Sequence, residues 1–550
     1  MFVFPKNSFL LILLIIISLV FITCSKEDII EPDIIDPEII DPENPISIDP
    51  EKIVSINTGS VTGPMYSFWS TRPMVNQTRF NSANFRADIE SIKTYVTSYN
   101  IVRILGGRTD DKNTFYQGVD ASGNIITDFS GLITSMNNFM LTGFKPRIVL
   151  DNVPWEMSLP RVVDTYGNSK PPNDYTLWRQ YINAFLQTLV DEFGMSEVKT
   201  WRFRVATEPN YSPNHWRGTK EDYFKHYDIT VDEVLKVIPD AMVGPGNLLT
   251  EGVATYTTEI IDHCANGVNY ATGAIGTKMD FFSISYYEKI DQNTVKLPGV
   301  AQLYRSKLNS YSQFSNIPFD IHEFGMLRDE NAIRGLSLTD ATELGASWYA
   351  TIADMAYQYG ITEIYDWGQE VEASSLPQGR KNVTSMLQMM EGGNRVDAIA
   401  NINGYAGVIP VVKNEKIYVL VYNHNPSRTS TASRTLYPQI EGGQVDGAEN
   451  WIMNEWTVDK THGVFMHELY KDVNAAGVST KNGRIYGNRP SDYFEDGWKD
   501  VLNANLSKYE RMAELPQTVT DSIVKKSNGN ITLQVDLAPH SVKLIELTPQ

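Results

Sequence analysis

The stretch KTWRFRVATEPNY, residues 199–211, decides how the rest of the chain is interpreted. Trp201, Phe203 and Val205 recur at every second position, which is the period of a β-strand. Pro209 cannot continue the strand and favours extended geometry for Glu208 before it. The stretch therefore predicts a strand that ends on a carboxylate. Catalytic groups lie at such ends in parallel barrels, but most glutamates there are only solvated, so a second carboxylate is needed to support a catalytic role.

Short apolar segments alternate with amphipathic helical patterns between residues 53 and 369. Such alternation is typical of a parallel sheet covered by helices, and eight strands are enough to close a (β/α)8 TIM barrel. An open doubly wound sheet is the alternative, but no glycine-rich phosphate loop follows the first strand. The expected strands are residues 63–69, 100–105, 145–151, 200–206, 241–246, 280–287, 319–324 and 362–367, and the expected helices are residues 82–99, 175–193, 220–237 and 338–359.

The texture of the sequence changes after the last of these strands. Residues 416–422, 531–535 and 541–547 resemble strands bounded by turn residues, and residues 492–513 are more helical. We therefore expect an α/β protein in which a catalytic barrel, residues 53–375, precedes a C-terminal antiparallel β-sandwich domain, residues 376–550.

The N-terminus has the pattern of an export signal. An apolar run at residues 8–23 follows Lys6 and is directly followed by Cys24. A permanent anchor helix is the alternative, but a cysteine at this position resembles the lipid-attachment site of bacterial lipoproteins. Residues 25–28, SKED, resemble the acidic export signal of lipoproteins from Bacteroidetes-type bacteria. Residues 1–23 are thus expected to be a lipoprotein signal peptide.

Residues 24–52 form an acidic, proline-rich linker that should be extended, because proline fixes φ and the charges repel. The resemblance implies a protein that is lipid-anchored at Cys24 in the cell envelope, in the outer membrane and facing the cell surface. The anchor would be its one contact with the membrane.

Composition and charge exclude several classes of function. A chain of 550 residues that is 42% hydrophobic and 11% aromatic can bury a large core, and a net charge of -19 disfavours nucleic acid as a partner. Beyond Cys24 the chain has only Cys264, so no intramolecular disulfide is expected. No HExxH motif, close cluster of His and Cys, or Walker loop occurs, and no metal or other cofactor is expected.

Glu208 has a counterpart at the end of another predicted strand. In IHEFG, residues 321–325, Glu323 follows a hydrophobic strand that is seventh in order, whereas Glu208 follows the fourth. Two carboxyl groups would then face each other across the mouth of the barrel. Glycoside hydrolysis requires such a pair, one acid to protonate the leaving oxygen and one carboxylate to act as nucleophile or base.

Several motifs resemble those of clan A glycoside hydrolases. Thr207-Glu208-Pro209-Asn210 is similar to the Asn-Glu-Pro motif of the acid/base, and residues 322–325, HEFG, are similar to the nucleophile motif. Arg103 resembles the arginine that contacts the nucleophile, and Trp367 resembles the aromatic floor of the subsite where cleavage occurs. The similarity is greatest to family 39, the family of β-xylosidases and α-L-iduronidases.

Two further segments support family 39. Residues 280–287, DFFSISYY, are similar to its sixth-strand segment, in which Tyr287 matches the tyrosine that hydrogen-bonds the nucleophile, and residues 456–462 resemble the segment after its sandwich strands. Two positions depart from the pattern. Thr207 replaces the usual Asn, and Ser285 replaces a frequent His, which implies a different contact with the sugar's 2-position.

The resemblance implies a retaining glycoside hydrolase that acts on an oligosaccharide or polysaccharide. Glu323, held by Arg103 and Tyr287, would attack the anomeric carbon, and Glu208 would protonate the leaving oxygen and then activate water. A non-catalytic glycan-binding lipoprotein of a polysaccharide-uptake system is the alternative, although such a protein has no need of both carboxylates. A transglycosidase would use the same intermediate.

Other residues at predicted strand ends are weaker candidates. Trp155 and Asn247 are predicted to contact substrate, as is Thr207 beside the acid/base. His215 and Trp216 share these loops, and packing among the loops is an equally good explanation for each of them. Asp151 and Glu370 also follow strands but lie in no recognisable motif.

Overall fold

The computed structural model describes residues 49–250, 252–289, 294–327, 341–370, 374, 376–400, 402, 404–481 and 490–550. All of the described residues belong to one compact unit. The predicted signal peptide, Cys24 and most of the acidic linker lie outside the described residues. Within the described ranges, no helix has both the length and the apolarity that a bilayer span requires.

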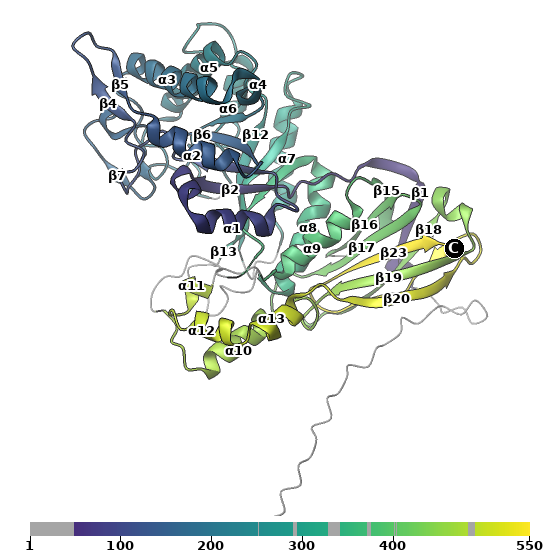
Figure 1. Cartoon of the computed structure of the whole chain (residues 1–550). Helices are drawn as coiled ribbons and strands as arrows, with labels where there is room; N and C mark the ends of the chain where they lie inside the picture. The colour runs from purple at the N-terminus through teal and green to yellow at the C-terminus, as the bar shows by residue number, and fades with distance from the viewer. Residues whose placement is uncertain are drawn as a thin grey trace, which may run out of the picture. The chain divides into compact units, whose positions relative to one another are not determined.

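A parallel sheet closes into the predicted barrel (Figure 1). Its two end strands, β10 and β11, are separated in the chain only by Gly246 and Asn247, so they are two halves of one barrel strand. All neighbouring strands are parallel, which confirms the (β/α)8 prediction. The strands are β2 (Thr71–Asn76), β3 (Ser98–Val102), β6 (Lys145–Leu150), β9 (Arg202–Val205), β10 (Met242–Pro245), β11 (Leu248–Leu249), β12 (Phe282–Lys289), β13 (Phe319–Leu327) and β14 (Ile361–Asp366).

A helix follows each barrel strand and buries its apolar stripe against the sheet. Two of them have the predicted limits, and each has a side-chain cap: Asp174 accepts from the Thr176 amide, and Thr219 forms a capping box with Asp222. The helices are α1 (Ala83–Ile92), α2 (Ser130–Met140), α3 (Tyr175–Phe193) with α4 (Met195–Val198), α5 (Lys220–Val237), α6 (Glu259–Asn266), α7 (Leu297–Asn309), α8 (Glu343–Tyr359) and α9 (Gly379–Met390).

Two hairpins extend from the loops that follow barrel strands. One consists of β4 (Tyr116–Val119) and β5 (Ile125–Thr127), and it follows β3. The other consists of β7 (Val163–Asp164) and β8 (Gly167–Asn168), and it follows β6. Because both lie after the carboxyl ends of strands, they belong to the face of a barrel where active sites are built.

The first barrel strand differs from the prediction. Strand β2 begins at Thr71 rather than near Gly63, and Phe68 and Trp69, whose apolar character suggested a strand, are buried in the turn before it. Gly63 belongs instead to β1 (Ile53–Pro64), which pairs antiparallel with β15 and parallel with β18 in the second sheet. Residues 53–64, which were expected to begin the barrel domain, therefore lie in the C-terminal sheet.

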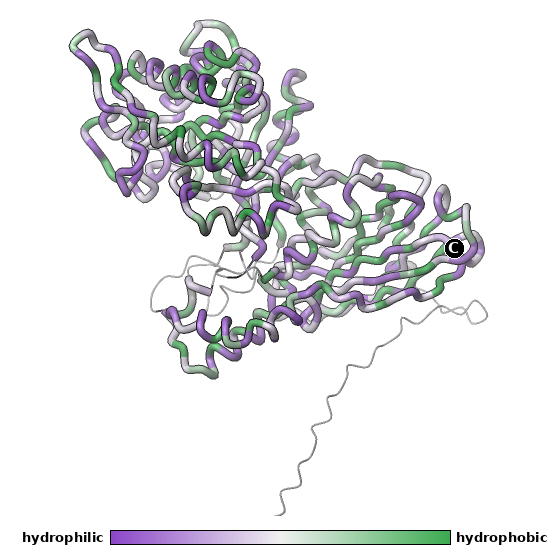
Figure 2. The backbone as a smooth tube through the Cα atoms, in the orientation of Figure 1, coloured by the Kyte–Doolittle hydropathy of each residue, from purple (hydrophilic) through white to green (hydrophobic). Residues whose placement is uncertain are grey.

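The second sheet has ten strands and is antiparallel apart from the β1–β18 pair. Its strands follow one another in a single hydrogen-bonded order from β20 to β21, and strands from both ends of that order share one apolar core, which includes Val524 of β20 and Ile531 of β21. Hydrophobic positions recur along these strands (Figure 2). Besides β1, the strands are β15 (Asn394–Ala400), β16 (Tyr405–Lys413), β17 (Lys416–His424), β18 (Arg434–Glu441), β19 (Asn450–Val458), β20 (Gln517–Lys525), β21 (Ile531–Thr532), β22 (Val535–Leu537) and β23 (Ser541–Pro549).

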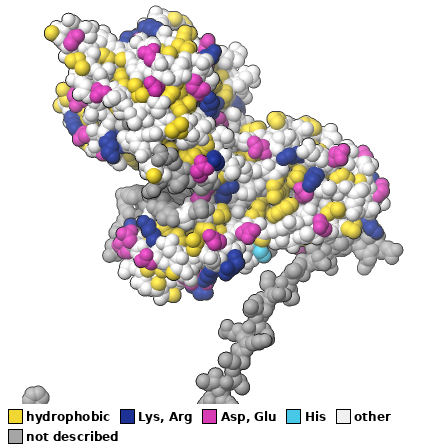
Figure 3. Space-filling view, viewed as in Figure 1, with side chains coloured by type: hydrophobic (Ala, Val, Ile, Leu, Met, Phe, Trp, Pro, Cys, Tyr) yellow, Lys and Arg dark blue, Asp and Glu magenta, His cyan; other side chains and the backbone are white. Residues whose placement is uncertain are grey.

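The predicted helical segment lies between β19 and β20. Its apolar cluster includes Phe465, Trp498 and Tyr509, and it also contains Ala341 and Leu376 from the loops after β13 and β14. The helices are α10 (Met466–Ala475), α11 (Pro490–Tyr493), α12 (Trp498–Ala504) and α13 (Leu506–Ala513). Charged side chains of both signs are interspersed on the face shown in Figure 3.

Helix α8 joins the barrel to the second sheet through buried polar contacts. The Tyr422 hydroxyl on β17 donates to Asp354 Oδ2 at 2.7 Å, and the Ser347 hydroxyl lies 3.0 Å from Nδ1 of His424. Burial raises the pKa of Asp354 to about 6. Because the folded pKa lies above the unfolded one, this carboxyl favours folding at low pH, and that contribution is lost as the pH rises through about 6.

We predict that Asp354→Asn raises the stability of the fold at pH 8 by about 2 kcal/mol but has little effect at pH 4, since the amide still accepts the Tyr422 hydrogen bond without a buried charge. Thermal unfolding of both proteins at the two pH values checks this. Asp240→Asn, at an exposed aspartate, is the matched control. A lower melting temperature of the Asp354 variant at pH 8 would contradict the prediction.

Candidate active site

Glu208 is presented by a tight turn after β9. Glu208 and Ala206 have φ values of 41° and 69°, so Glu208 is left-handed, and the predicted extended geometry is wrong. The turn closes where the Tyr211 amide donates to the Glu208 carbonyl at 2.8 Å. Left-handed geometry costs a non-glycine residue about 1–2 kcal/mol, so surrounding contacts must hold the turn.

The side chain of Asn210, which is fully buried, supplies such contacts. Its amide nitrogen donates to the carbonyls of Leu249 and Tyr256, both at 2.9 Å, and its oxygen accepts from the Leu249 amide at 2.8 Å. These bonds satisfy the amide and tie the Glu208 turn to the neighbouring barrel strand.

Gly246 allows that strand to approach the turn. A Cβ atom at Gly246 would lie 2.7 Å from Pro209 Cδ and 3.0 Å from the carbonyls of Val205 and Ala206. The Gly246 amide also donates to the Tyr223 hydroxyl at 2.7 Å, and that hydroxyl donates to the Val205 carbonyl at 3.0 Å. Only glycine fits here without displacing the backbone that carries Glu208.

Glu323 lies on β13 and accepts hydrogen bonds from two neighbours. The Tyr287 hydroxyl donates to its Oε2 at 2.9 Å, and the Asn247 amide lies 3.4 Å from its Oε1. Trp367 donates from Nε1 to the Tyr287 oxygen at 2.6 Å, and its side chain is 46% exposed. Four predicted site residues are thereby brought together, with an accessible aromatic ring beside the nucleophile candidate.

The two carboxyl groups have different electrostatic environments. Burial and the charge of Glu323 raise the pKa of Glu208 to about 8. Burial also raises the pKa of Glu323, but Arg204, the Tyr287 hydroxyl and Arg103 oppose that rise. The cations and hydrogen-bond donors thus favour ionisation of Glu323, whereas the charge of Glu323 favours the protonated form of Glu208.

Ser285, at the position where the family often has His, links the two halves of the site. Its hydroxyl accepts from Asn247 Nδ2 at 2.7 Å, and its hydrogen bond to Glu208 lowers the pKa of that carboxyl. Asn247 Oδ1 is buried and has no hydrogen-bond partner among the described residues. It can accept a hydrogen bond from a ligand hydroxyl.

Arg103 lies near the site but bonds elsewhere. Its Nε donates to the Tyr166 carbonyl at 3.2 Å, and its guanidinium carbon is 5.5 Å from the centre of the Tyr166 ring. Among the ion pairs of the described residues, none joins Arg103 to Glu323. Its charge nevertheless lowers the pKa of Glu323. The expected direct contact with the nucleophile is therefore replaced by a longer-range interaction.

Thr207 is committed to protein partners. Its hydroxyl donates to Asp151 Oδ2 at 2.7 Å and accepts from Arg204 Nη2 at 3.0 Å. A threonine hydroxyl has one donor hydrogen, so Thr207 has none left for a substrate. Asp151, which sequence reasoning ranked low, thus belongs to the site as a support for Thr207.

Trp155 does not offer a stacking surface. It is 4% exposed, its Nε1 donates to the Arg108 carbonyl at 3.1 Å, and the Arg161 guanidinium lies 4.1 Å from its ring centre. The prediction that Trp155 contacts substrate is not supported by this burial, and the alternative of loop packing describes it better.

Tyr166 was not among the predicted site residues. It lies at the tip of the β7–β8 hairpin, is 42% exposed, and stacks on His215 with ring centres 4.4 Å apart. His215 Nε2 is 3.4 Å from Glu208 Oε2, and burial lowers the pKa of His215 to about 3, so the imidazole is neutral. A tyrosine in a loop far from any motif left no signal in the sequence.

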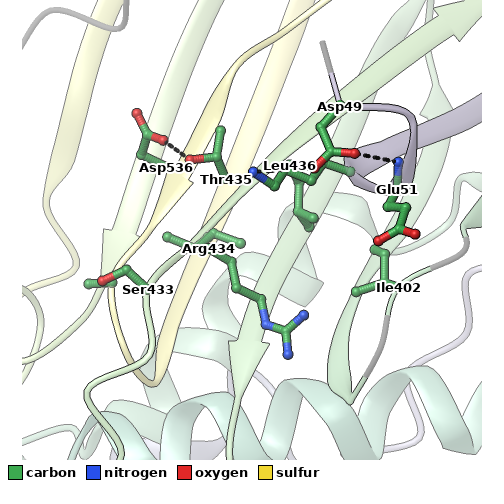
Figure 4. A pocket seen from close by; sticks show the side chains of 11 residues that line it. Asp49, Glu51, Ile402, Ser433, Arg434, Thr435, Leu436 and Asp536 are labelled. Carbon is green, nitrogen blue, oxygen red and sulfur yellow. Dashed lines mark hydrogen bonds and ion pairs between the residues drawn. The ribbon is translucent and has the colours of Figure 1, made fainter.

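A pocket of about 610 Å³ lies in the second sheet, and none of the predicted site residues lines it (Figure 4). Side chains of both charges line it, and its described lining includes no aromatic ring. Within the described ranges, no three His, Cys, Asp or Glu side chains are grouped to hold a metal ion. The charged lining residues are Asp49, Glu51, Lys52, Arg434 and Asp536.

Comparison with known proteins gives consistent matches. The model of the Glycosyl hydrolases family 39 matches residues 52–337. A β-xylosidase of Caldicellulosiruptor saccharolyticus is 26% identical over 516 residues, which cover 90% of this chain and 98% of the relative. An α-1,4-L-rhamnosidase of Formosa agariphila is 24% identical over 359 residues, 61% of this chain and 71% of the relative.

A solved structure shares the fold. The crystal structure of the GH39 enzyme from Xanthomonas axonopodis pv. citri aligns with a TM-score of 0.67 at 14% identity, covering 91% of this chain and 98% of that one. Barrel and β domain thus occur together in a protein of similar length.

We predict that Gly246→Ala lowers the free energy of unfolding by about 1–3 kcal/mol, because the added methyl overpacks the Glu208 turn. Gly252→Ala is the matched control, since a Cβ there meets no heavy atom within 4 Å. Urea denaturation of both variants measures the difference. Equal stability of the two variants would show that the turn relaxes without cost.

Proposed function

The chain belongs to family 39 of the glycosyl hydrolases, and from this premise we propose that Glu323 and Glu208 carry out a retaining hydrolysis by double displacement. The protein is a glycoside hydrolase. The assignment of roles depends on the unequal environments of the two carboxyl groups. Glu323 accepts hydrogen bonds from Tyr287 and Asn247, whereas the pKa of Glu208 is raised to about 8.

In the first step, Glu323 Oε attacks the anomeric carbon and forms a covalent glycosyl-enzyme. Glu208 donates its proton to the glycosidic oxygen, which leaves as an alcohol. Once Glu323 is esterified, its negative charge is lost, so the pKa of Glu208 falls and its carboxylate becomes a base.

In the second step, Glu208 removes a proton from water, which attacks the anomeric carbon and releases Glu323. The Tyr287 hydroxyl, oriented by Trp367, stabilises the carboxylate that leaves. The two inversions together retain the anomeric configuration.

The sugar is proposed to be a pentose or deoxyhexose, because the relatives are named as a β-xylosidase and an α-1,4-L-rhamnosidase. Neither sugar carries a 6-hydroxyl that would have to be accommodated. Trp367 and Tyr166 are both partly exposed beside the glutamates, so their aromatic rings can stack on a sugar ring. A non-catalytic glycan-binding protein is not favoured, because both carboxylates are held in environments suited to their roles.

A panel of 4-nitrophenyl glycosides, including the β-D-xyloside and the α-L-rhamnoside, tests the proposal. We predict that Glu208→Ala and Glu323→Ala each lower kcat by at least about 10³-fold on the substrate that wild type hydrolyses, because each role has no substitute. Wild-type rates in either folded variant would contradict the assignment.

Azide separates the two roles. In Glu323→Ala, azide should replace the nucleophile and restore turnover, and the product should be a glycosyl azide of inverted configuration. In Glu208→Ala, azide should replace the attacking water and restore turnover, and the glycosyl azide should have retained configuration. NMR of the products decides, and exchanged configurations would exchange the roles.

We further propose that the protein is attached to the cell envelope by lipid at Cys24 and acts on oligosaccharide or polysaccharide at the cell surface. The apolar run before Cys24 and the acidic linker after it support this location. Metabolic labelling with an alkyne fatty acid should tag wild type and leave Cys24→Ala untagged. Equal labelling of both would refute attachment at Cys24.

A further inference from the structure

One buried arginine contacts the residues that immediately precede both catalytic glutamates. Arg204 on β9 is 2% exposed. Its Nη2 donates to the Thr207 hydroxyl at 3.0 Å, and its Nη1 lies 2.9 Å from Nδ1 of His322. Thr207 directly precedes Glu208, and His322 directly precedes Glu323.

The two contacts bridge the barrel. Thr207 follows β9, the fourth barrel strand, and His322 lies on β13, the seventh. A guanidinium is planar and rigid, so the separation of its two terminal nitrogens is fixed. Through them, Arg204 links the side chains that adjoin the two carboxyl groups in the sequence.

We propose that Arg204 is a positioning residue for the hydrolysis, one that spaces Glu208 and Glu323 through Thr207 and His322 and supplies the buried cation that faces the nucleophile. This inference rests on the proposed function. It gives Arg204 the role that Arg103 would have by family resemblance, since Arg103 donates to the Tyr166 carbonyl.

The hydrogen bond from Arg204 determines the tautomer of His322. Arginine can only donate, so His322 Nδ1 must be the acceptor and the ring hydrogen must lie on Nε2. That nitrogen is 3.4 Å from Asp320 Oδ2, and Asp320 is paired with Arg202 at 2.8 Å. The contact with Arg204 therefore sets one tautomer, and the imidazole connects Arg204 to β13 through Nδ1, while Nε2 makes no hydrogen bond among the described residues.

The Thr207 hydroxyl is fixed by hydrogen bonds to two neighbours. Its hydroxyl hydrogen goes to Asp151 Oδ2 at 2.7 Å, and Asp151 Oδ1 accepts the Arg103 amide at 2.6 Å. The lone pair that faces Arg204 is therefore the acceptor. Strands β3, β6, β9 and β13 are thus joined by one chain of hydrogen bonds below the two carboxyl groups.

The groups that act on Glu323 come from several elements. Arg204 on β9, the Tyr287 hydroxyl on β12, Arg103 after β3 and the Asn247 amide between β10 and β11 all lower the pKa of Glu323, and Arg204 does so most. Glu208 is the anion that opposes ionisation when it is itself charged, and Asp151 is a second buried carboxyl near Arg204.

The experiment compares Arg204→Lys with Arg204→Met on the 4-nitrophenyl glycoside that wild type hydrolyses. Lysine keeps the charge but cannot reach both acceptors in a fork, whereas methionine removes the charge as well. We expect kcat to fall at least tenfold in both, with KM changed less than threefold. The acid limb of the kcat/KM profile should move up by about one pH unit only in the methionine variant.

Arg147→Met is the matched control. Arg147 is a partly buried arginine of the same sheet, paired with Glu363 at 3.0 Å and not with either catalytic residue or its neighbour. It should lose stability without a shift of the acid limb. An equal shift in Arg147→Met, or none in Arg204→Met, would overturn the proposal.

Fluorescence gives a readout that needs no substrate. Trp367 donates to Tyr287, which donates to Glu323, so ionisation of Glu323 should change the emission of Trp367. The pH transition should be absent in Glu323→Gln and Trp367→Phe and should lie higher in Arg204→Met than in wild type. If no glycoside is cleaved, this titration still decides the inference about Arg204.

A second pair of variants covers the case in which neither Arg204 variant folds. Thr207→Val removes the acceptor of one arm of the fork with little change in shape, and Thr207→Ser keeps it. We expect valine to lower kcat at least tenfold and serine to restore most of it. Equal rates in the two variants would show that this arm positions nothing.

Discussion

The active site depends on buried arginines inside the barrel. Arg202 and Arg204 point from β9 to partners on β13, where Arg202 meets Asp320 at 2.8 Å and Arg204 meets His322 at 2.9 Å. Burial of a cation costs several kcal/mol unless its charge is compensated. Asp320 compensates Arg202, whereas Asp151 and Glu323 are the nearby anions of Arg204 and neutral His322 only accepts one of its hydrogen bonds. These contacts favour the relative placement of β9 and β13 seen in the structure.

That placement determines the chemistry. Because Glu208 and Glu323 directly follow residues that Arg204 contacts, the constraint that satisfies the buried cation also fixes the two carboxyl groups. Arg204 lowers the pKa of Glu323 more than any other neighbour does. Burial and the charge of Glu323 raise the pKa of Glu208 to about 8. One arrangement of charges thus supports both the fold and the division into acid and nucleophile.

Sequence patterns predicted the repeating part of the fold and the residues in motifs. The strands that carry Glu208 and Glu323, and the helices α3 and α5, were expected because their periods are regular. The first barrel strand was predicted to begin near Gly63, but Gly63 belongs to β1, which pairs in the second sheet. The apolar residues of β1 could be buried in either sheet. Period alone does not tell which sheet a strand joins.

Arg204 could have been noticed in the opening stretch. In WRFRV, residues 201–205, the positions between the apolar ones are both arginines, although the strand period is carried by the apolar residues alone. In a closed barrel the other face is buried as well, and all of residues 202–205 are buried. Tyr166 had no such signal, because its position depends on a hairpin whose contacts join residues distant in the chain, such as Asp164 and Arg217 at 2.5 Å.

The replacement at position 207 constrains the substrate contact. An asparagine amide has two donor hydrogens, and one could remain for a sugar hydroxyl, whereas the single hydrogen of Thr207 is taken by Asp151. Thr207 can therefore only accept. Asn247 Oδ1 is likewise an acceptor without a partner among the described residues. A ligand group that meets either atom must therefore donate the hydrogen bond.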